Sequence, residues 1–437
     1  MHHRHVDPAS LDLGQTVRDL GPGVTRWPFL IGIGGLVVAV VLALVRAAVV
    51  GDGGSLERLM FAYLQNFFFF LTIMFGALFF VLVSHLTRAG WSVTVRRIAE
   101  VMAATIWPYF ALMFLPILAC VWLSPGLVYP WTDSGYVASH PAVAHKTAYL
   151  NATFFTIRAV VYFASWAFLA GKFYRDSLRQ DETGEAQISK RFEGRSAWGT
   201  LIVFLTVTFA AVDWVMSLAP EWYSTMFGVY VIAGSMLSFF GALWVVVHLM
   251  QSRGVLRDAV TVEHQHDIGK YMFGFIIFWG YITFCQFLLI WYGDIPEETH
   301  WFLDRQYGGW QWIGILLILA HFVIPFFGTM SRHVKRNRKA MLFWCVWIVV
   351  VHWFDVAYMI LPEAQPALLP GYRSFAVEGT GETISAAAFL LNLLMDLSML
   401  VAVGGLTVSG FVRTAAGHAL VPLKDPRLEE SLAFHNV

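Results

Sequence analysis

Ionisable and amide side chains lie inside long apolar stretches of this sequence, where each one costs free energy unless it has a partner or a function. The set comprises Arg158, Asp213, Gln286, His321, His352, Asp355, Asn392 and Asp396. His352 and Asp355 are three residues apart, so a helix places them on one face, as it does Asn392 and Asp396 at four apart. A carboxylate beside arginine stays ionised, whereas one beside histidine exchanges a proton near neutral pH. These residue types indicate a proton relay or a pocket for a quinone headgroup.

The proton-path hypothesis uses Asp213, Arg158, His321, His352, Asp355, Asn392 and Asp396. Within it we expect two acid–base pairs, Arg158 with Asp213 and His321 with Asp355, the first structural and the second competent to move protons. The alternative is a quinone or quinol site formed by Arg158, Asp213 and Gln286. Interhelical hydrogen bonds in a purely structural anchor would also account for such residues, and a stand-alone secondary transporter is a fourth reading.

The composition is that of an integral membrane protein. Hydrophobic residues make up 58% of the 437 residues and charged residues only 13%, about half the charged share of a soluble domain. The formal net charge of zero gives no electrostatic footprint for nucleic acid. Three cysteines are too few for a disulfide framework. There is no P-loop or dinucleotide fingerprint, and we expect no metal site and no catalytic residue.

Ten segments are long and apolar enough to cross a bilayer, which takes about 20 residues of helix. They are residues 27–49, 60–86, 100–123, 149–171, 198–219, 226–250, 271–292, 310–330, 341–361 and 385–410. Such runs are too long for the strands of an outer-membrane barrel, so the predicted fold class is all-α. Pro108 and Pro116 in the third span, and Pro325 in the eighth, predict kinks.

The basic residues predict the orientation of the chain. Of the 29 Lys and Arg residues, 23 lie in the tails and in alternate loops, and the opposite loops hold only Arg58, Lys146, Arg305 and Arg373. The positive-inside rule then places both termini in the cytoplasm. At about 1.5 Å per residue, the polar set lies about 9 to 16 Å below the outer ends of its spans. His85, Glu100 and His248 lie at inner span ends, where we expect them to reach water.

An internal repeat divides the chain. Asp213 is followed seven residues later by Pro220–Glu221, and Asp355 is followed at the same interval by Pro362–Glu363. Four spans separate the copies, so both run in the same direction, as in parallel repeats. We therefore predict two parallel four-helix bundles, spans two to five and six to nine, flanked by spans one and ten. The corresponding segments are an N-tail 1–26, the first span and outer loop 27–59, bundles 60–225 and 226–384, the tenth span 385–410 and a C-tail 411–437.

Several longer motifs resemble a known family. They are Tyr129–Pro130–Trp131, His145–Lys146–Thr147–Ala148–Tyr149–Leu150–Asn151, Ile157–Arg158–Ala159, the run from Thr206 to Leu218, Trp222–Tyr223–Ser224–Thr225, the run from Phe284 to Gly293, Pro296–Glu297–Glu298 and Gly308–Gly309–Trp310–Gln311–Trp312. In this order they resemble the ActF-type membrane subunits of bacterial alternative complex III. That family is part of the wider NrfD and polysulfide-reductase membrane-subunit group. The resemblance runs from about residue 25 to 415.

The resemblance implies a subunit of a respiratory or photosynthetic quinol:cytochrome c oxidoreductase, not catalytic alone, in the bacterial cytoplasmic membrane. Its implied partners are a multihaem cytochrome c, an iron–sulfur subunit, a second NrfD-like subunit, small membrane subunits and lipid. The haem and iron–sulfur centres belong to those partners. ActF-type chains carry no redox centre and are expected to provide a proton path, although quinone or menaquinone binding is also attributed to them. The motif-matching positions for either role are Arg158, Asp213, Gln286 and His321.

Overall fold

The structure is a computed structural model that describes residues 11–51, 53–364, 368 and 384–435. The regular elements of this part of the chain are all helices, and ten of its helical segments are long and apolar enough to cross a membrane. This confirms the all-α fold for the described residues and supports a multi-pass membrane protein. The expected outer loop 362–384, with Arg373, and the first residues of the N-tail lie mostly outside the described residues.

The ten segments follow one another along the chain, and the longer connections 124–151 and 294–309 carry short helices of their own. Six are single long helices: α1 (Trp27–Val50), α2 (Ser55–Leu86), α8 (Ala152–Thr183), α10 (Phe227–Ser252), α11 (Val262–Gly293) and α17 (Ala386–Ala415). Two end in a 3₁₀ turn: α9 (Gln187–Trp214) before Met216–Leu218, and α16 (Arg338–Ile360) before Leu361–Glu363. The third and eighth are interrupted: α3 (Val93–Ala104), α4 (Ala111–Met113) and α5 (Leu115–Leu123), then α13 (Trp310–Leu317) and α14 (Ile324–Met330).

The interruptions fall where the prolines predict them. A π-helical turn, Ile106–Phe110, separates α3 from α4 and contains Pro108, and Trp107 before it has an extended backbone at φ −119° and ψ 131°. The residue before a proline is pushed out of the helical region by the proline ring. Pro325 is the second residue of α14, directly after a second π-helical turn, Ile318–Val323. The kink predicted at Pro108 is therefore confirmed, whereas Pro325 coincides with a π-helical turn and Pro116 is the second residue of α5.

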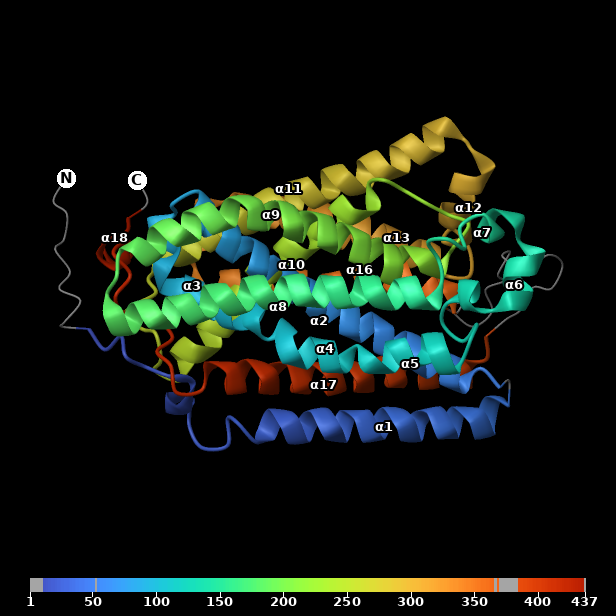
Figure 1. Cartoon of the computed structure of the whole chain (residues 1–437), viewed down its shortest axis with the longest axis horizontal. Coiled ribbons are helices and arrows are strands. Elements are labelled where there is room, and N and C mark those ends of the chain that lie inside the picture. Colours follow the sequence, from blue (N-terminus) through green and yellow to red (C-terminus); the bar gives the residue numbers. More distant parts are fainter. Residues whose placement is uncertain (1–10, 52, 365–367, 369–383, 436–437) are drawn as a thin grey trace.

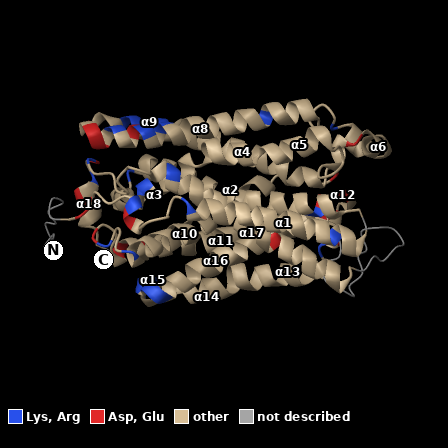
Figure 2. Cartoon of the chain, turned by 90° about the horizontal axis from the view of Figure 1, so that it is seen from below, with Lys and Arg blue, Asp and Glu red and all other residues tan. Residues whose placement is uncertain are grey.

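Two ends of the molecule differ in what they carry (Figure 1). The terminal end carries the described ends of the chain and α18 (Leu428–Leu432), and the distal end carries α6 (Ser134–Ser139), α7 (Pro141–Ala144) and α12 (Pro296–Asp304). The helix α15 (Arg332–Arg336) also lies at the terminal end (Figure 2). Lys and Arg gather at the terminal end on α3, α9 and α15 (Figure 2). The uneven distribution of Lys and Arg along the sequence therefore corresponds to a basic end and a less basic end of the fold.

Several segments expected as loops at the terminal end are helical, so the predicted span limits are wrong there. The helix α8 continues to Thr183 and α9 begins at Gln187, which leaves only the turn 184–186 of the expected loop 172–197. Gly184 closes α8 at φ 69°, the left-handed conformation that favours glycine at a helix end. The extensions occur because charged residues such as these are good helix formers once the chain has left the apolar region.

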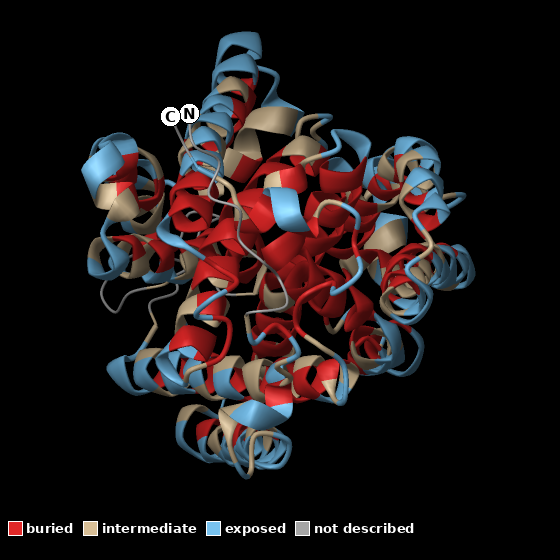
Figure 3. Cartoon of the chain, turned by 90° about the vertical axis from the view of Figure 1, so that its left-hand side faces the viewer, coloured by how far each residue is buried: buried red, intermediate tan, exposed pale blue. Residues whose placement is uncertain are grey.

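The helices α2 and α10 form the centre of the molecule. They pack against each other. In the most apolar 18-residue stretch of each helix, 89% of the residues are buried in α2 and 78% in α10, against 22% in the peripheral α1. On one side, α2 also contacts α3 and α9, and α8 packs against α3 and α9. On the other side, α10 also contacts α11 and α16, and the eighth span packs against α11 and α16. Figure 3 shows the buried residues in this centre and exposed faces around the rim.

The helix α1 is held almost entirely by α17, along which it runs (Figure 1). Glycines make this approach close: a Cβ added at Gly35 would lie 2.7 Å from the backbone nitrogen of Ala402, and one at Gly405 would lie 2.5 Å from the nitrogen of Gly32. Small residues at such a contact let two backbones approach, which is how apolar helices associate in lipid.

Candidate functional site

Arg158 and Asp213 form a buried ion pair, as the sequence predicts. Arg158 on α8 donates from Nε to Asp213 Oδ2 at 2.7 Å and from Nη2 to Oδ1 at 2.9 Å. The Tyr162 hydroxyl donates to the same Oδ2 at 2.7 Å. Asp213, on α9, is 0% exposed. Three donors on one carboxylate, two of them from a bidentate arginine, hold the Asp213 side chain in place, so this pair is suited to fixing α8 to α9.

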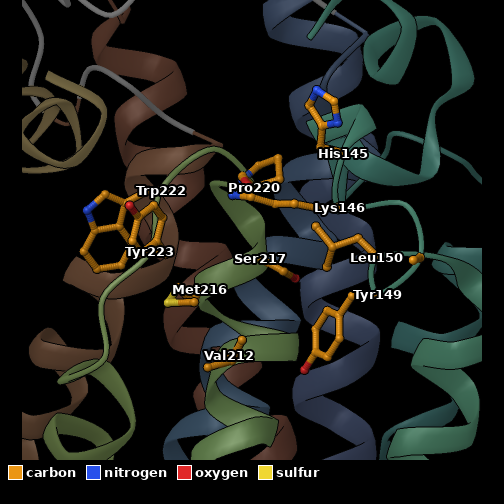
Figure 4. A pocket seen from close by; sticks show the side chains of 11 residues that line it. His145, Lys146, Tyr149, Leu150, Val212, Met216, Ser217, Pro220, Trp222 and Tyr223 are labelled. Carbon is orange, nitrogen blue, oxygen red and sulfur yellow. Dashed lines mark hydrogen bonds between the residues drawn. The ribbon is translucent and has the colours of Figure 1, made fainter. Parts of the chain in front are cut away.

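A pocket of about 280 Å³ lies at the distal end, with Tyr149, Val212 and Ser217 in its lining (Figure 4). Tyr149 lines it, and the Tyr149 ring covers the Arg158 guanidinium with 3.8 Å between Cζ and the ring centre. At the rim Lys146 Nζ donates to the carbonyl oxygens of Pro220 at 2.7 Å and Glu221 at 3.2 Å. Burial lowers the pKa of the Lys146 ammonium, and the nearby Glu221 carboxylate opposes that shift.

Asp355 is the centre of a second buried cluster, on α16. The Tyr230 hydroxyl donates to its Oδ1, and Trp279 Nε1 donates to its Oδ2 at 3.2 Å. His352 Nδ1 lies 3.4 Å from Oδ2, and His321 Nδ1 lies 4.0 Å from the same oxygen. Each aspartate of the repeat thus binds one tyrosine hydroxyl, but Asp355 has two imidazoles where Asp213 has a guanidinium.

The two histidines of this cluster differ in their bonding. Nε2 of His352 lies 2.9 Å from the Thr72 hydroxyl on α2, so this ring bridges α16 to the central helix. His321 is 0% exposed, and neither of its ring nitrogens makes a hydrogen bond within the described residues. Gly234 of α10 provides the room, because a Cβ there would lie 3.0 Å from His352 Cε1. A carboxylate with two adjacent imidazoles brings together the groups that general acid–base chemistry uses to accept and pass on a proton.

A third group of polar residues connects α16 to α17 across α2. Trp353 Nε1 donates to Asn66 Oδ1 at 2.8 Å, and Asn66 Nδ2 donates to the Asp396 carbonyl at 3.2 Å. Arg58 Nη2 forms an ion pair with Asp396 Oδ2 at 2.5 Å, and the two side chains are 4% and 7% exposed. The sequence placed Arg58 in an outer loop, and that assignment is wrong: it lies in the first turn of α2, inside the protein.

Asn392, one turn before Asp396, binds a second arginine. Arg46 Nε donates to Asn392 Oδ1 at 2.9 Å, and its Nη1 donates to the Ser55 hydroxyl at 3.0 Å. Both arginines of this group were missed as candidates because each lies close to an end of its span, where arginine normally reaches the interface. The signals in the sequence were the spacing of Asn392 and Asp396 on one helix face and the position of Arg46 inside the predicted span 27–49.

Gln286 lies apart from the Arg158–Asp213 pair. It is on α11, which packs against α10, α16 and the eighth span, whereas the pair joins α8 to α9. Its Oε1 is buried and makes no hydrogen bond within the described residues. Within the described residues, no hydrogen bond therefore joins Gln286 to Arg158 or Asp213, and the Asp213 carboxylate already accepts three hydrogen bonds from Arg158 and Tyr162.

A cluster of charges is buried at the terminal end. Glu100 is 1% exposed and forms ion pairs with Arg96 at 3.3 Å and Arg97 at 3.1 Å. Arg96 also pairs with Asp425 of the C-terminal segment, and Arg97 pairs with Asp181 at 2.7 Å. His85 is buried as well, at 6% exposure. The expectation that Glu100 and His85 reach water at their span ends is wrong, because the C-terminal segment and α8 cover them.

The geometry therefore defines a polar region in the distal half that spans Asp355, His352, Thr72, Asn66 and Asp396, and a separate charged cluster at the terminal end. No protein-family model matches the chain, and no curated protein matches it.

Proposed function

We propose that this chain is a membrane subunit, without a redox centre of its own, of a quinol-oxidising electron-transfer complex, and that it provides a proton path. The observation that carries the proposal is the Asp355 cluster: a buried carboxylate with two imidazoles within 4.0 Å. Ionisable groups at this depth are costly in a membrane protein and typically mark ion or proton pathways. The type of complex, its multihaem and iron–sulfur partners and the location in the bacterial cytoplasmic membrane are inferred from the family resemblance alone.

Two further parts of the proposal concern architecture. We assign α2, α3, α8 and α9 with their associated turns to one four-helix bundle, and α10, α11, the eighth span and α16 to a second, flanked by α1 and α17. The contacts around α2 and α10 support this division. We place the terminal end in the cytoplasm, because the gathering of Lys and Arg there (Figure 2) fits the positive-inside rule.

The proton path has two fixed parts and a gap. Its distal part is the region from Asp396 to His352 and Thr72, and its terminal part is the cluster around Glu100. On α2, Thr72 and His85 are thirteen residues apart, which is about 20 Å along the helix. The proposal requires water or reorienting side chains to carry protons over this distance.

Replacement of Asp355 tests the proposal. In the assembled complex, reconstituted in sealed vesicles, Asp355→Asn should lower the number of protons translocated per electron and leave assembly and electron transfer intact. Asp213→Asn is the matched comparison, since this carboxylate occupies the equivalent place in the repeat but is bound by arginine. The substitution should lower stability, but in complexes that assemble the proton stoichiometry should be unchanged. An unchanged proton-to-electron ratio in Asp355→Asn would refute the proton path and favour a purely structural subunit.

A further inference from the structure

A groove of about 560 Å³ lies between the eighth span and α16, apart from the buried clusters described above. Leu316 and Ala320 of the eighth span form one wall, and apolar residues of α16 form the other. Among the described residues that line the groove, Lys339 alone is charged. The groove is therefore an apolar channel with a single cation, and an occupant must match both features.

The groove is open to lipid along its length. Phe343, Val346 and Val350 line it and are 55%, 44% and 49% exposed, and both segments are long and apolar enough to cross the bilayer. Lys339 and Phe354, the first and last lining residues on α16, are fifteen positions apart, which is about 22 Å along a helix. Half of the hydrocarbon core is about 15 Å thick. The groove therefore has room for an acyl chain of one leaflet.

The charged end of the groove lies at the terminal end of the molecule. Lys339 is the second residue of α16 and is exposed, and none of the described residues pairs with its ammonium group. The chain just before it is strongly basic (Figure 2). Within eight residues, Lys339 is preceded by Arg332, Lys335, Arg336 and Arg338.

Two of these cations bind neutral groups, which leaves their charge in place. Lys335 Nζ donates to two backbone carbonyl oxygens, at 2.7 and 2.8 Å, and Arg338 donates to the side-chain oxygen of Gln251. Arg336 instead forms an ion pair with Glu263. A cluster of about four to eight Lys and Arg residues beside a spanning helix is typical of a binding site for anionic lipid headgroups.

A second groove, along α11, provides a comparison. Its volume is about 530 Å³, and it also combines a lysine, Lys270, with apolar residues such as Phe275 and Phe278. Here, however, the Lys270 ammonium pairs at 2.5 Å with Asp267, which lines the same groove. The two grooves are thus alike in size and apolar lining, but only the one at Lys339 presents a charge without a partner among the described residues.

We infer that the groove between the eighth span and α16 binds an anionic glycerophospholipid, with its phosphate against Lys339 and an acyl chain along Phe343 and Val350. A phosphate offers acceptor oxygens to more than one of the neighbouring cations, which a single fatty-acid carboxylate does less well. A zwitterionic lipid brings its own ammonium group into this basic segment, where like charges repel. Such a site differs from general contact with bilayer lipid because it selects the headgroup charge, and it does not depend on the proton path.

Photo-crosslinking tests this inference on the full chain in lipid nanodiscs. Phosphatidylglycerol and phosphatidylcholine analogues, each with a diazirine on one acyl chain, are compared at equal mole fraction, and the labelled residues are mapped by mass spectrometry. The phosphatidylglycerol analogue should label groove residues such as Val346 at least fivefold more strongly. Unlabelled phosphatidylglycerol should compete, whereas oleate and glycerol 3-phosphate should not. Equal labelling by the two analogues, or competition by oleate or glycerol 3-phosphate equal to that of phosphatidylglycerol, would overturn the inference.

A pair of lysine variants separates this site from the general positive field. Lys339→Met keeps a long side chain without the charge and should lower labelling by phosphatidylglycerol about fivefold, the factor that one lysine near anionic lipid contributes. Lys270→Met is the matched control, because that ammonium is already paired with Asp267, and it should leave labelling of the groove unchanged. If the two variants lowered the labelling equally, or if Lys339→Met left it unchanged, Lys339 would not bind the headgroup.

A second pair of variants tests the apolar part of the groove. Val346→Trp fills part of it and should lower the phosphatidylglycerol labelling several-fold, whereas Val408→Trp on α17 should not. The two valines are 44% and 48% exposed, but only Val346 lines the groove. Equal labelling in these two variants would show that the acyl chain lies elsewhere.

Discussion

The Arg158–Asp213 pair offers the clearest energetic test of the fold. Asp213 accepts hydrogen bonds from Arg158 Nε and Nη2 at 2.7 and 2.9 Å and from the Tyr162 hydroxyl at 2.7 Å. Arg158→Met keeps a long apolar side chain but leaves a fully buried carboxylate with one donor. Removal of one partner from a buried pair costs about 3 to 5 kcal/mol, because the remaining charge is uncompensated.

Two further variants separate the charge from the hydrogen bonds. Tyr162→Phe leaves the ion pair intact and should cost only about 1 kcal/mol, since interhelical hydrogen bonds in a membrane protein average about 0.6 kcal/mol. Arg158→Met combined with Asp213→Leu removes both charges and should be more stable than Arg158→Met alone, because replacement of a whole buried pair by apolar residues is often nearly neutral.

The measurement is the free energy of unfolding of the purified full chain in bicelles, obtained by steric trapping for all variants under one set of conditions. We expect Arg158→Met to be the least stable and Tyr162→Phe to lie near the unmodified chain. If Arg158→Met lost less than about 1 kcal/mol, or if the double variant were no more stable than Arg158→Met, the carboxylate would not depend on the guanidinium for its burial.

Two other predictions concern the periphery and the terminal end. Gly35→Val should separate α1 from α17, because its Cβ would lie 2.7 Å from the backbone nitrogen of Ala402. Gly34→Val is the control and should be neutral, since a Cβ there meets nothing within 4 Å. The yield of crosslinking between cysteines placed in α1 and α17 measures the separation, and equal yields in the two variants would contradict the prediction. Glu100→Gln should cost about 2 kcal/mol, less than a lone buried pair, because Arg96 and Arg97 keep their other carboxylates; an unchanged midpoint of thermal unfolding would disprove this.

Much of the fold was predictable because a bilayer restricts what a chain can do. Backbone groups cannot remain unsatisfied in hydrocarbon, so runs of about 20 apolar residues must be helices. For the same reason Pro108 and Pro325 reliably marked the interrupted spans. The limits of the helices at the terminal end were not predictable from apolar character, since α8 and α9 extend through charged residues that hydropathy assigns to a loop.

The candidate site was predictable only in part. The repeat indicated Asp213 and Asp355 as equivalent positions, and the fold gives each a tyrosine hydroxyl and a basic partner. Arg58 escaped prediction because it lies only three residues inside α2, where the sequence resembles an interfacial anchor. Its burial follows from the packing of α2 against α17, a contact between residues more than 300 positions apart, which no local pattern encodes.

The sequence by itself determined the class of protein, the number of spanning helices and the short set of polar residues that a membrane interior makes costly. These properties depend on composition and spacing along one helix at a time. Only the tertiary structure decided which of those residues meet: that Asp396 pairs with Arg58, that His352 bonds Thr72 and that Gln286 stands apart from Arg158 and Asp213. The physical reason is that hydrophobicity fixes which segments enter the membrane, whereas close packing between helices distant in sequence fixes their neighbours.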